Sequence, residues 1–252
     1  LKVLFDYKEE METGARIGRQ EMLDYYGLWA HQIKTPLAAM RLLLQSFEEG
    51  EIEEEAELIR PMKMELFKTE QYVEMVLSYL RMGDMSSDLS LQWYSIDDIV
   101  RQAVRKYSQL FILKKIHLKY QKCEGMVLTD EKWFLLVLEQ LLSNALKYTP
   151  RNGNVHVCAY TEQNTWSIEV SDTGIGIPAG ERKYLGGRFF RGSNAVNQKV
   201  PGSGIGLMLV CKLVRLHKGR IFISSTEGEG TCVRVTFPMG NRHLRKARFI
   251  KV

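Results

Sequence analysis

The sequence contains no run of about 18 apolar residues, the minimum that normally crosses a membrane as a helix. It has only four cysteines, which stand far apart and form no CxxC pair, so a zinc site is not indicated. Each cysteine lies in an apolar stretch, which favours packing as a small hydrophobic residue in a reducing compartment. The net charge of +5 is mild and no aromatic-rich basic motif accompanies it, so we expect no nucleic-acid partner.

The two ends of the chain lead to separate expectations. The chain begins at Leu1 rather than at methionine, and we expect it to be a soluble piece of a longer protein. Residues 241–252 carry five positive charges, and we expect this basic tail to be solvated. Contact of the tail with an anionic membrane face is the alternative.

The first third of the sequence has a helical pattern. Apolar residues recur at three- and four-residue steps in two series, which are separated by a glutamate-rich stretch around Gly50. The pattern predicts an antiparallel helical hairpin over residues 1–82, with the glutamates at a solvated tip. One hairpin cannot bury both apolar stripes, so we expect a homodimer that forms a four-helix bundle. Residues 83–90, rich in Gly, Ser and Asp, are predicted to be a linker.

Residues 91–240 change to short strands around apolar helices. Helices are predicted from about Asp97, over 130–148 and over 204–217, and strands alternate with them. The predicted strands lie near 93–95 and over 116–121, 126–130, 155–162, 165–174, 220–226 and 231–238. Strands covered by helices give an α+β sandwich.

Two glycine clusters point to phosphate handling. They are DTGIGIP over 172–178 and GSGIGL over 202–207. Glycines let a backbone approach a phosphate closely, and the second cluster opens a helix whose free N–H groups can hold an anion. Neither cluster is a P-loop, because GK[ST] is absent, and neither completes a dinucleotide fingerprint.

The helix that contains LLSNALKYTP (141–150) supplies the complementary side chains. Asn144, Lys147 and Tyr148 fall on one helical face by their three- and four-residue spacing. An amide oxygen suits Mg²⁺, a lysine can neutralise phosphate charge, and a tyrosine can cover a sugar or base. Asp172 ends a predicted strand, where its carboxylate could accept a hydrogen bond from an adenine amino group.

Together these stretches resemble a known family. HQIKTP (31–36) is similar to the H-box of bacterial sensor histidine kinases, LLSNALKYTP to the N-box, and RFFRG (188–192) to the F-box, with a glycine box on each side of the F-box. The chain thus resembles the cytoplasmic core of such a kinase over nearly its whole length. The stretch around His31, YYGLWAHQIKTPLA, is most similar to intramembrane-sensing kinases of the bacitracin or antimicrobial-peptide type.

The resemblance implies a reaction and its residues. His31 would accept the γ-phosphoryl group of ATP and pass it to an aspartate of a response regulator. Pro36 would bend the helix just beyond it, and Thr35 would position a water for a phosphatase activity. The ATP-binding domain would be of the GHKL type, with a mobile lid over about 178–202 that Phe189 and Phe190 anchor to the bundle. The implied ATP-site residues are Asn144 (also the Mg²⁺ ligand), Lys147, Tyr148, Asp172, Gly174, Gly176, Gly202, Gly204, Gly206, Leu207 and Thr231.

The family also implies partners and a location. A homodimer and a response regulator are expected, and the subfamily adds an ABC transporter reached through a missing membrane segment. The expected location is the cytoplasmic face of the bacterial membrane.

Three motifs depart from the family pattern. Gln32 stands where many members have an acidic base, so autophosphorylation could be slow. Gln140 replaces the first N-box asparagine, and Gly186 with Gly187 replace an acidic start of the F-box, which should loosen the lid.

Two other functions are left open by these departures. Gyrase- and chaperone-type ATPases share the ATP-binding fold but use a glutamate base at the position of Gln140, and they lack an HxxKTP helix. A nucleotide-sensing pseudokinase is the third reading, because Gln32 removes a base.

Overall fold

The computed structural model describes residues 26–27, 29–50, 54–81, 90–162, 164–187, 190–198, 200 and 202–239. The chain divides into two compact units, Leu1–Gly83 and Asp84–Val252. The predicted linker lies outside the described residues except for Ser90, as do the predicted basic tail and Phe189.

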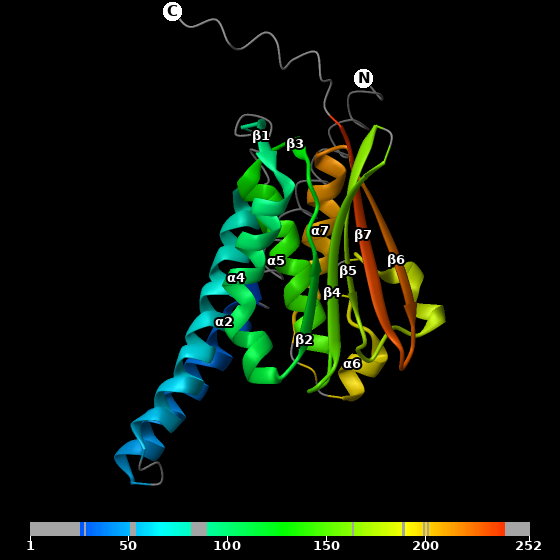
Figure 1. The fold of residues 1–252 in the computed structure, drawn as a ribbon. Helices are drawn as coiled ribbons and strands as arrows, with labels where there is room; N and C mark the ends of the chain where they lie inside the picture. Colours follow the sequence, from blue (N-terminus) through cyan, green and yellow to red (C-terminus); the bar gives the residue numbers. More distant parts are fainter. Residues whose placement is uncertain are drawn as a thin grey trace, which may run out of the picture. The chain divides into compact units, whose positions relative to one another are not determined.

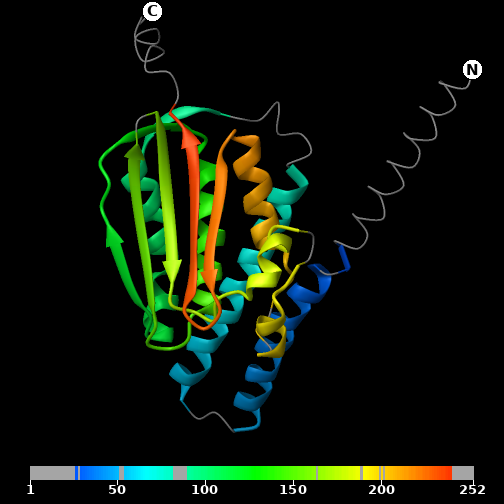
Figure 2. The ribbon, with the colours of Figure 1, turned by 90° about the vertical axis from the view of Figure 1, so that its right-hand side faces the viewer.

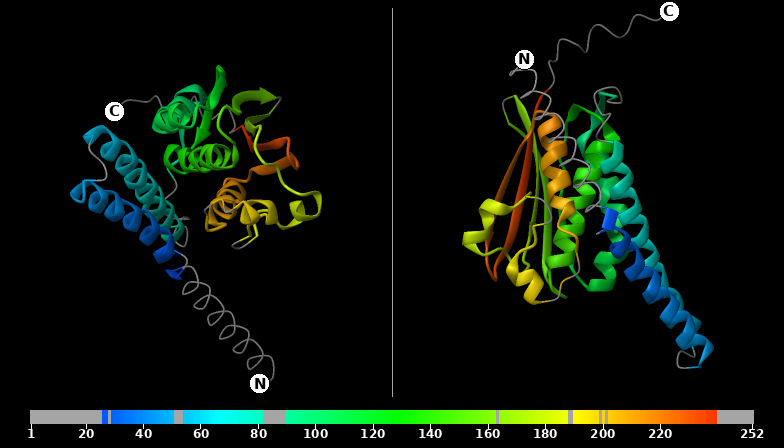
Figure 3. Two further views of the ribbon diagram at one scale, coloured as in Figure 1. Left: turned by 90° about the horizontal axis from the view of Figure 1, so that it is seen from below. Right: turned by 180° about the vertical axis from the view of Figure 1, so that it is seen from behind.

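The described part of the first unit is a helical hairpin (Figure 3), whereas residues 1–25 of the predicted hairpin lie outside the described residues. Residues 29–48 are helical, and α2 (Glu55–Arg81) runs back beside them. Gly50 makes the turn with a φ of +76°, a backbone conformation that glycine adopts without steric penalty. Pro36 and Pro61 lie inside the two helices, and each helix continues past its proline.

Large apolar side chains lie exposed along both helices of the hairpin. Their exposed fractions range from 37% to 63%, which is high for leucine, valine, isoleucine and phenylalanine. They are Leu37, Leu42, Leu44, Phe47, Ile59, Leu66, Val73, Leu77 and Leu80.

The second unit contains a five-stranded mixed sheet and a two-stranded one. The larger sheet has the order β2-β4-β5-β7-β6, in which β2 pairs parallel with β4 and the other pairs are antiparallel. Its strands are β2 (His117–Gln121), β4 (Asn154–Glu162), β5 (Thr165–Asp172), β6 (Arg220–Thr226) and β7 (Gly230–Pro238). The smaller sheet pairs β1 (Gln92–Ser95) with β3 (Met126–Thr129).

Three helices cover one face of the larger sheet (Figures 1 and 2). They are α4 (Ile96–Lys114), α5 (Glu131–Tyr148) and α7 (Ile205–Leu216), and α5 contacts both of the others. Every predicted helix and strand of this unit is present. The parallel pairing of β2 with β4 was not foreseen; it follows from the crossover through β3 and α5 that separates the two strands.

An aromatic cluster joins α5 to the sheet. Trp166 of β5 is 1% exposed, and Phe134 of α5 meets it edge-on with ring centroids 4.7 Å apart. Phe237 of β7 stacks on Trp166 at 4.6 Å. Edge-on and offset aromatic contacts of this kind add to the burial of a large apolar area, so they fix α5 over the centre of the sheet.

The start of α5 is tied to the segment that enters the unit. One oxygen of Asp130, the N-cap residue, accepts the N–H groups of Lys132 (3.1 Å) and Trp133 (3.3 Å). The other oxygen accepts the N–H of Ser90 at 2.9 Å. A single buried carboxylate therefore satisfies two helix donors and holds the chain just before β1.

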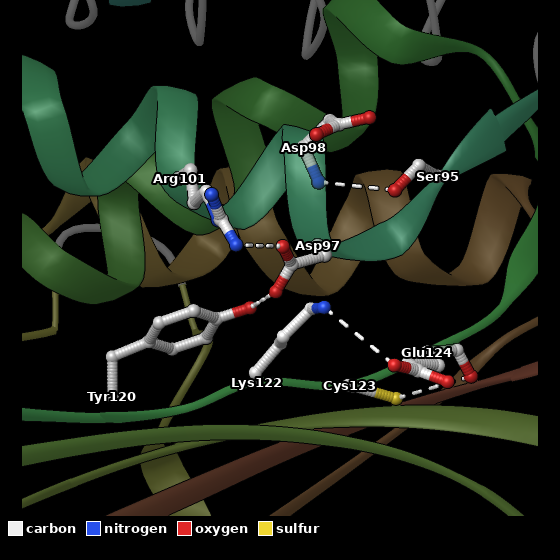
Figure 4. Close-up of polar contacts among 8 residues, drawn as sticks. All are labelled: Ser95, Asp97, Asp98, Arg101, Tyr120, Lys122, Cys123 and Glu124. Atoms are coloured by element: carbon white, nitrogen blue, oxygen red, sulfur yellow. Dashed lines mark hydrogen bonds and ion pairs between the residues drawn. The ribbon is translucent and has the colours of Figure 1, made fainter.

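A second polar cluster holds the start of α4 (Figure 4). Asp97 is 6% exposed; it accepts a hydrogen bond from the Tyr120 hydroxyl and pairs with Arg101 at 2.7 Å. An open cavity of about 450 Å³ lies beside it and includes Lys122 and Cys123, but none of the predicted site residues. The carboxylate is already satisfied by two partners, so the cluster ties α4 to β2.

We predict that Phe134→Ala lowers the free energy of unfolding by about 3–5 kcal/mol, because it leaves a cavity against Trp166. Urea denaturation of the full chain, followed at the transition of the second unit, measures the change. Phe222→Ala is the matched control, since Phe222 is 52% exposed on β6. Equal losses in the two variants would contradict the proposed core.

Candidate functional site

One face of α5 meets the second glycine cluster. A Cβ added to Gly206 would lie 2.7 Å from Gln140 Oε1 and 3.9 Å from Asn144 Oδ1. A Cβ added to Gly202 would collide with the Lys147 ammonium nitrogen. The side chains at 140, 144 and 147 share this face because they follow four- and three-residue steps. The predicted grouping of Asn144 and Lys147 with the glycines is therefore present in the structure.

The first glycine cluster is held against the end of α5. The N–H of Ile175 donates to Tyr148 O at 3.2 Å, and a Cβ on Gly174 would lie 2.6 Å from the same oxygen. Gly176 has a φ of +62°, and a Cβ there would collide with Thr226 O. Only glycine fits such close backbone approaches, which explains the DTGIGIP spacing.

Asp172 lies at the end of β5, as predicted. Its Oδ1 accepts the N–H groups of Gly174 (2.9 Å) and Thr231 (3.3 Å), so Oδ2 can accept from a ligand. Burial raises the pKa of the Asp172 carboxyl to about 6, although the two N–H donors lower it. Thr231 is held in turn by Ser225, with their hydroxyl oxygens 2.8 Å apart.

Positive charge gathers at the C-terminal end of α5. Burial, together with the nearby charges of Arg191 and Lys114, lowers the pKa of Lys147 to about 8. The Lys147 nitrogen lies 4.9 Å from the centre of the Tyr148 ring, and burial raises the pKa of that phenol. Like charges held together in a partly buried place favour a polyanionic ligand.

Arg191 is a site residue that the sequence reading did not single out. Its Nη2 donates to Val200 O, while its Nε is buried and has no hydrogen-bond partner among the described residues. Arg191 belongs to the F-box-like stretch RFFRG, but the sequence of that stretch does not indicate that its guanidinium lies near Lys147. That proximity arises only in the folded chain.

The start of α7 completes the anion-binding side of the site. Gly204 precedes α7 with a φ of +75° and offers no side chain as a cap, and Ser203 Oγ accepts only the N–H of Ile205, at 3.4 Å. Leu207 lies in this first turn. The N–H groups and the positive end of the helix dipole therefore remain suited to a phosphate.

The segment predicted as a lid is attached to the first glycine cluster. It contains the 3-10 helix η2 (Ala179–Tyr184) and α6 (Ser193–Asn197). Asn194 Nδ2 donates to Gly176 O (2.8 Å) and Ile175 O (3.3 Å). Phe190 packs on Tyr184 within the segment, with ring centroids 5.7 Å apart.

His31 lies exposed on the first helix of the hairpin. Thr35, also exposed, donates its hydroxyl to His31 O at 3.0 Å, and Gln32 is half-buried. Pro36 has no N–H with which to donate to Gln32 O, one helical turn earlier. The backbone next to His31 therefore lacks one regular hydrogen bond of the helix.

The fold and the site define a nucleotide-binding class. Residues 129–241 match the family model described as histidine kinase-, DNA gyrase B- and HSP90-like ATPase. This part of the chain is thus a domain of that ATPase class.

Proteins that are similar over most of the chain identify one group within this ATPase class. The chain is 28% identical, over 90% of its length, to sensor histidine kinase YxdK of Bacillus subtilis (strain 168), and 31% identical, over 86%, to sensor protein BceS of Halalkalibacterium halodurans. It spans 67% and 63% of those proteins. The fold is also that of Acinetobacter baumannii histidine kinase AdeS, with a TM-score of 0.58, 18% identity, and coverage of 84% of this chain and 98% of AdeS. The chain is therefore a relative of the bacterial sensor histidine kinases, and the resemblance stated from its motifs is confirmed.

We predict that Asp172→Asn becomes increasingly stabilising, relative to the original chain, as the pH rises from about 4 to 8. An unfolded aspartate titrates near pH 3.9, whereas burial raises the folded pKa of Asp172 to about 6. The proton is held more tightly in the folded state, so the stability that Asp172 contributes at low pH is lost as the pH rises through 6.

Melting temperatures of the two proteins across this pH range test the sign. Glu162→Gln, at an exposed position on β4, is the control for removing a carboxylate elsewhere in the unit. A flat difference for Asp172→Asn would contradict the buried carboxyl.

Proposed function

We propose that the chain is the catalytic core of a sensor histidine kinase. ATP bound in the second unit would phosphorylate His31, and the phosphoryl group would pass to an aspartate of a response regulator. The observation that carries the proposal is the convergence of Asp172, Asn144 and Lys147 with two glycine clusters, in a chain that also presents an exposed histidine within HQIKTP.

The nucleotide would be recognised from both ends. Asp172 Oδ2 would accept from the adenine amino group, while Lys147, Arg191 and the first turn of α7 would hold the phosphates. Tyr148 would cover the sugar or base. Thr231, Leu207 and the five glycines at 174, 176, 202, 204 and 206 would shape the pocket.

The donor set fits Mg²⁺ only together with the nucleotide. Asn144 Oδ1, with Gln140 Oε1 beside it, offers hard amide oxygens, and no group of three or more His, Cys, Asp or Glu side chains forms a metal cluster among the described residues. Amide oxygens carry no charge, so the phosphates would supply most of the attraction. When bound, Mg²⁺ would neutralise charge on the transferring phosphoryl group.

The transfer step would use the neutral imidazole of His31. A ring nitrogen would form a bond to the γ-phosphorus while the bond from that phosphorus to the bridging oxygen of ADP breaks, and ADP would leave. Gln32 cannot take a proton from the ring, so the chain lacks a carboxylate base at the next position. Thr35 is exposed one turn away from His31, where it could position a water for the proposed phosphatase activity.

A hydrolase of the gyrase or chaperone type is less well supported. Such an enzyme needs a carboxylate to activate water, and Gln140 occupies that position. The neighbouring Glu139 is 2% exposed and pairs with Lys106 of α4 at 2.6 Å, so its carboxylate is already engaged. A pseudokinase is the other alternative, and the labelling experiment described below distinguishes it from a kinase.

The exposed apolar side chains of the hairpin support a homodimer. Nine large apolar residues at 37–63% exposure make a surface that a second copy would cover. A place at the cytoplasmic face of the membrane and an ABC transporter partner rest on the subfamily resemblance. Within the described residues, no helix combines the length and apolar character needed to cross a bilayer.

We predict that His31→Ala abolishes the acid-labile, alkali-stable label transferred from γ-labelled ATP, because no other group can replace the imidazole. Nucleotide affinity should change less than about twofold, since Asp172 and Lys147 are untouched. His117→Ala, at an exposed histidine of β2, is the matched control and should label normally. Full labelling of the His31 variant would refute the assignment, and no label on the original chain would favour a pseudokinase.

We predict that Asn144→Ala loses the Mg²⁺-dependent part of ATP binding, because a methyl group cannot replace an oxygen ligand. Calorimetry of ATP with and without Mg²⁺ measures it, and Asn144→Asp, which keeps an oxygen, should retain part of the enhancement. Asn154→Ala is the exposed control. A wild-type Mg²⁺ enhancement in Asn144→Ala would remove the metal role.

A further inference from the structure

The C-terminal end of α5 has a missing backbone donor. In a regular helix Leu146 O would accept the N–H of residue 150, but that residue is Pro150, which has none. A residue before proline avoids the helical region, and Thr149 indeed leaves the helix in an extended conformation with φ −84° and ψ 129°. Leu146 O therefore needs a donor from elsewhere.

Lys114 supplies that donor from another helix. It is the last residue of α4, and its Nζ donates to Leu146 O at 2.5 Å. The contact joins residues 32 positions apart in the chain. A charged donor at a helix C-terminus also interacts favourably with the negative end of the helix dipole.

The same turn carries much of the nucleotide site. Lys147 and Tyr148 follow Leu146 directly, and Tyr148 O accepts the Ile175 N–H of the first glycine cluster at 3.2 Å. A displaced turn would therefore move a phosphate-binding lysine and a glycine loop together.

We propose that Lys114 is a positioning residue for nucleotide binding: it completes the end of α5 where Pro150 cannot, and so fixes Lys147, Tyr148 and the first glycine cluster. The consequence for ATP rests on the proposed function, whereas the consequence for the helix end does not. Lys114 lies on α4, outside all the motifs that define the site.

The charge of Lys114 gives a second, separable effect. The groups that act on Lys147 are Lys114 from α4, Arg191 from the segment before α6, and the Tyr148 ring. Removing the Lys114 charge would raise the pKa of Lys147 toward its ordinary value, because one of the two like charges is gone. A purely structural lysine, far from the phosphates, would leave that titration unmoved.

The test uses the full chain with Lys114→Met, which keeps the aliphatic stem, and Lys114→Arg, which keeps a charged donor. Hydrogen exchange in the absence of nucleotide should be faster at the amides of Thr149 and Ile175 in the methionine variant and near normal in the arginine variant. NMR titration should show a higher pKa for Lys147 in the methionine variant only. Lys119→Met, at an exposed lysine of β2, is the control and should change neither measurement.

Nucleotide binding is measured separately. MgATP should bind Lys114→Met roughly tenfold more weakly, the size expected from losing one charge-assisted hydrogen bond, and Lys114→Arg should restore most of the affinity. Normal exchange at Thr149 and Ile175 together with normal affinity in Lys114→Met would overturn the proposal. If that variant does not fold, Lys114→Gln replaces it; glutamine removes the charge but keeps an N–H donor, so the pKa of Lys147 should still rise while hydrogen exchange changes less. Failure of the original chain to bind ATP would refute the proposed function, while the exchange comparison would still decide the role of Lys114 at the helix end.

Discussion

The packing of α5 over the centre of the sheet is the constraint on which the catalytic unit depends. Phe134 on one side of the helix closes against Trp166 and Phe237, and this contact fixes the helix in rotation and in height. Another side of the helix then presents Gln140, Asn144 and Lys147 to the second glycine cluster. A rotation of α5 would open the core and misplace the site at once, so stability and ligand geometry are coupled in one element.

The two ends of the site carry ionisable groups of opposite charge, a carboxyl at one end and an ammonium at the other. At one end Asp172 is a half-buried carboxyl whose pKa is raised, and two backbone N–H groups orient it. At the other end Lys147 is a half-buried ammonium whose pKa is lowered by desolvation and by the charges of Arg191 and Lys114. Each charged form is held in an environment that disfavours it. A ligand that offers an amino group to the first and phosphate oxygens to the second would relieve both penalties.

Local sequence patterns predicted most of what lies within single elements. The face shared by Asn144 and Lys147 followed from helical spacing, and Asp172 was expected at a strand end because DTG closes an alternating run. The contacts of Lys114 with Leu146 and of Asn194 with Gly176 were not predictable, since each joins segments distant in the chain. The parallel pairing of β2 with β4 was also not predicted, because the partner of a strand depends on how the crossover between the two strands packs.

Asp130 gives the unit a mechanical property. Its two carboxylate oxygens accept hydrogen bonds from different segments. One accepts from the first turn of α5 and the other from the N–H of Ser90. Because the carboxylate is rigid and planar, a displacement of the chain at Ser90 would also displace the N-cap of α5. The segment that enters this unit is thereby coupled to α5 at the end of the helix opposite Asn144 and Lys147.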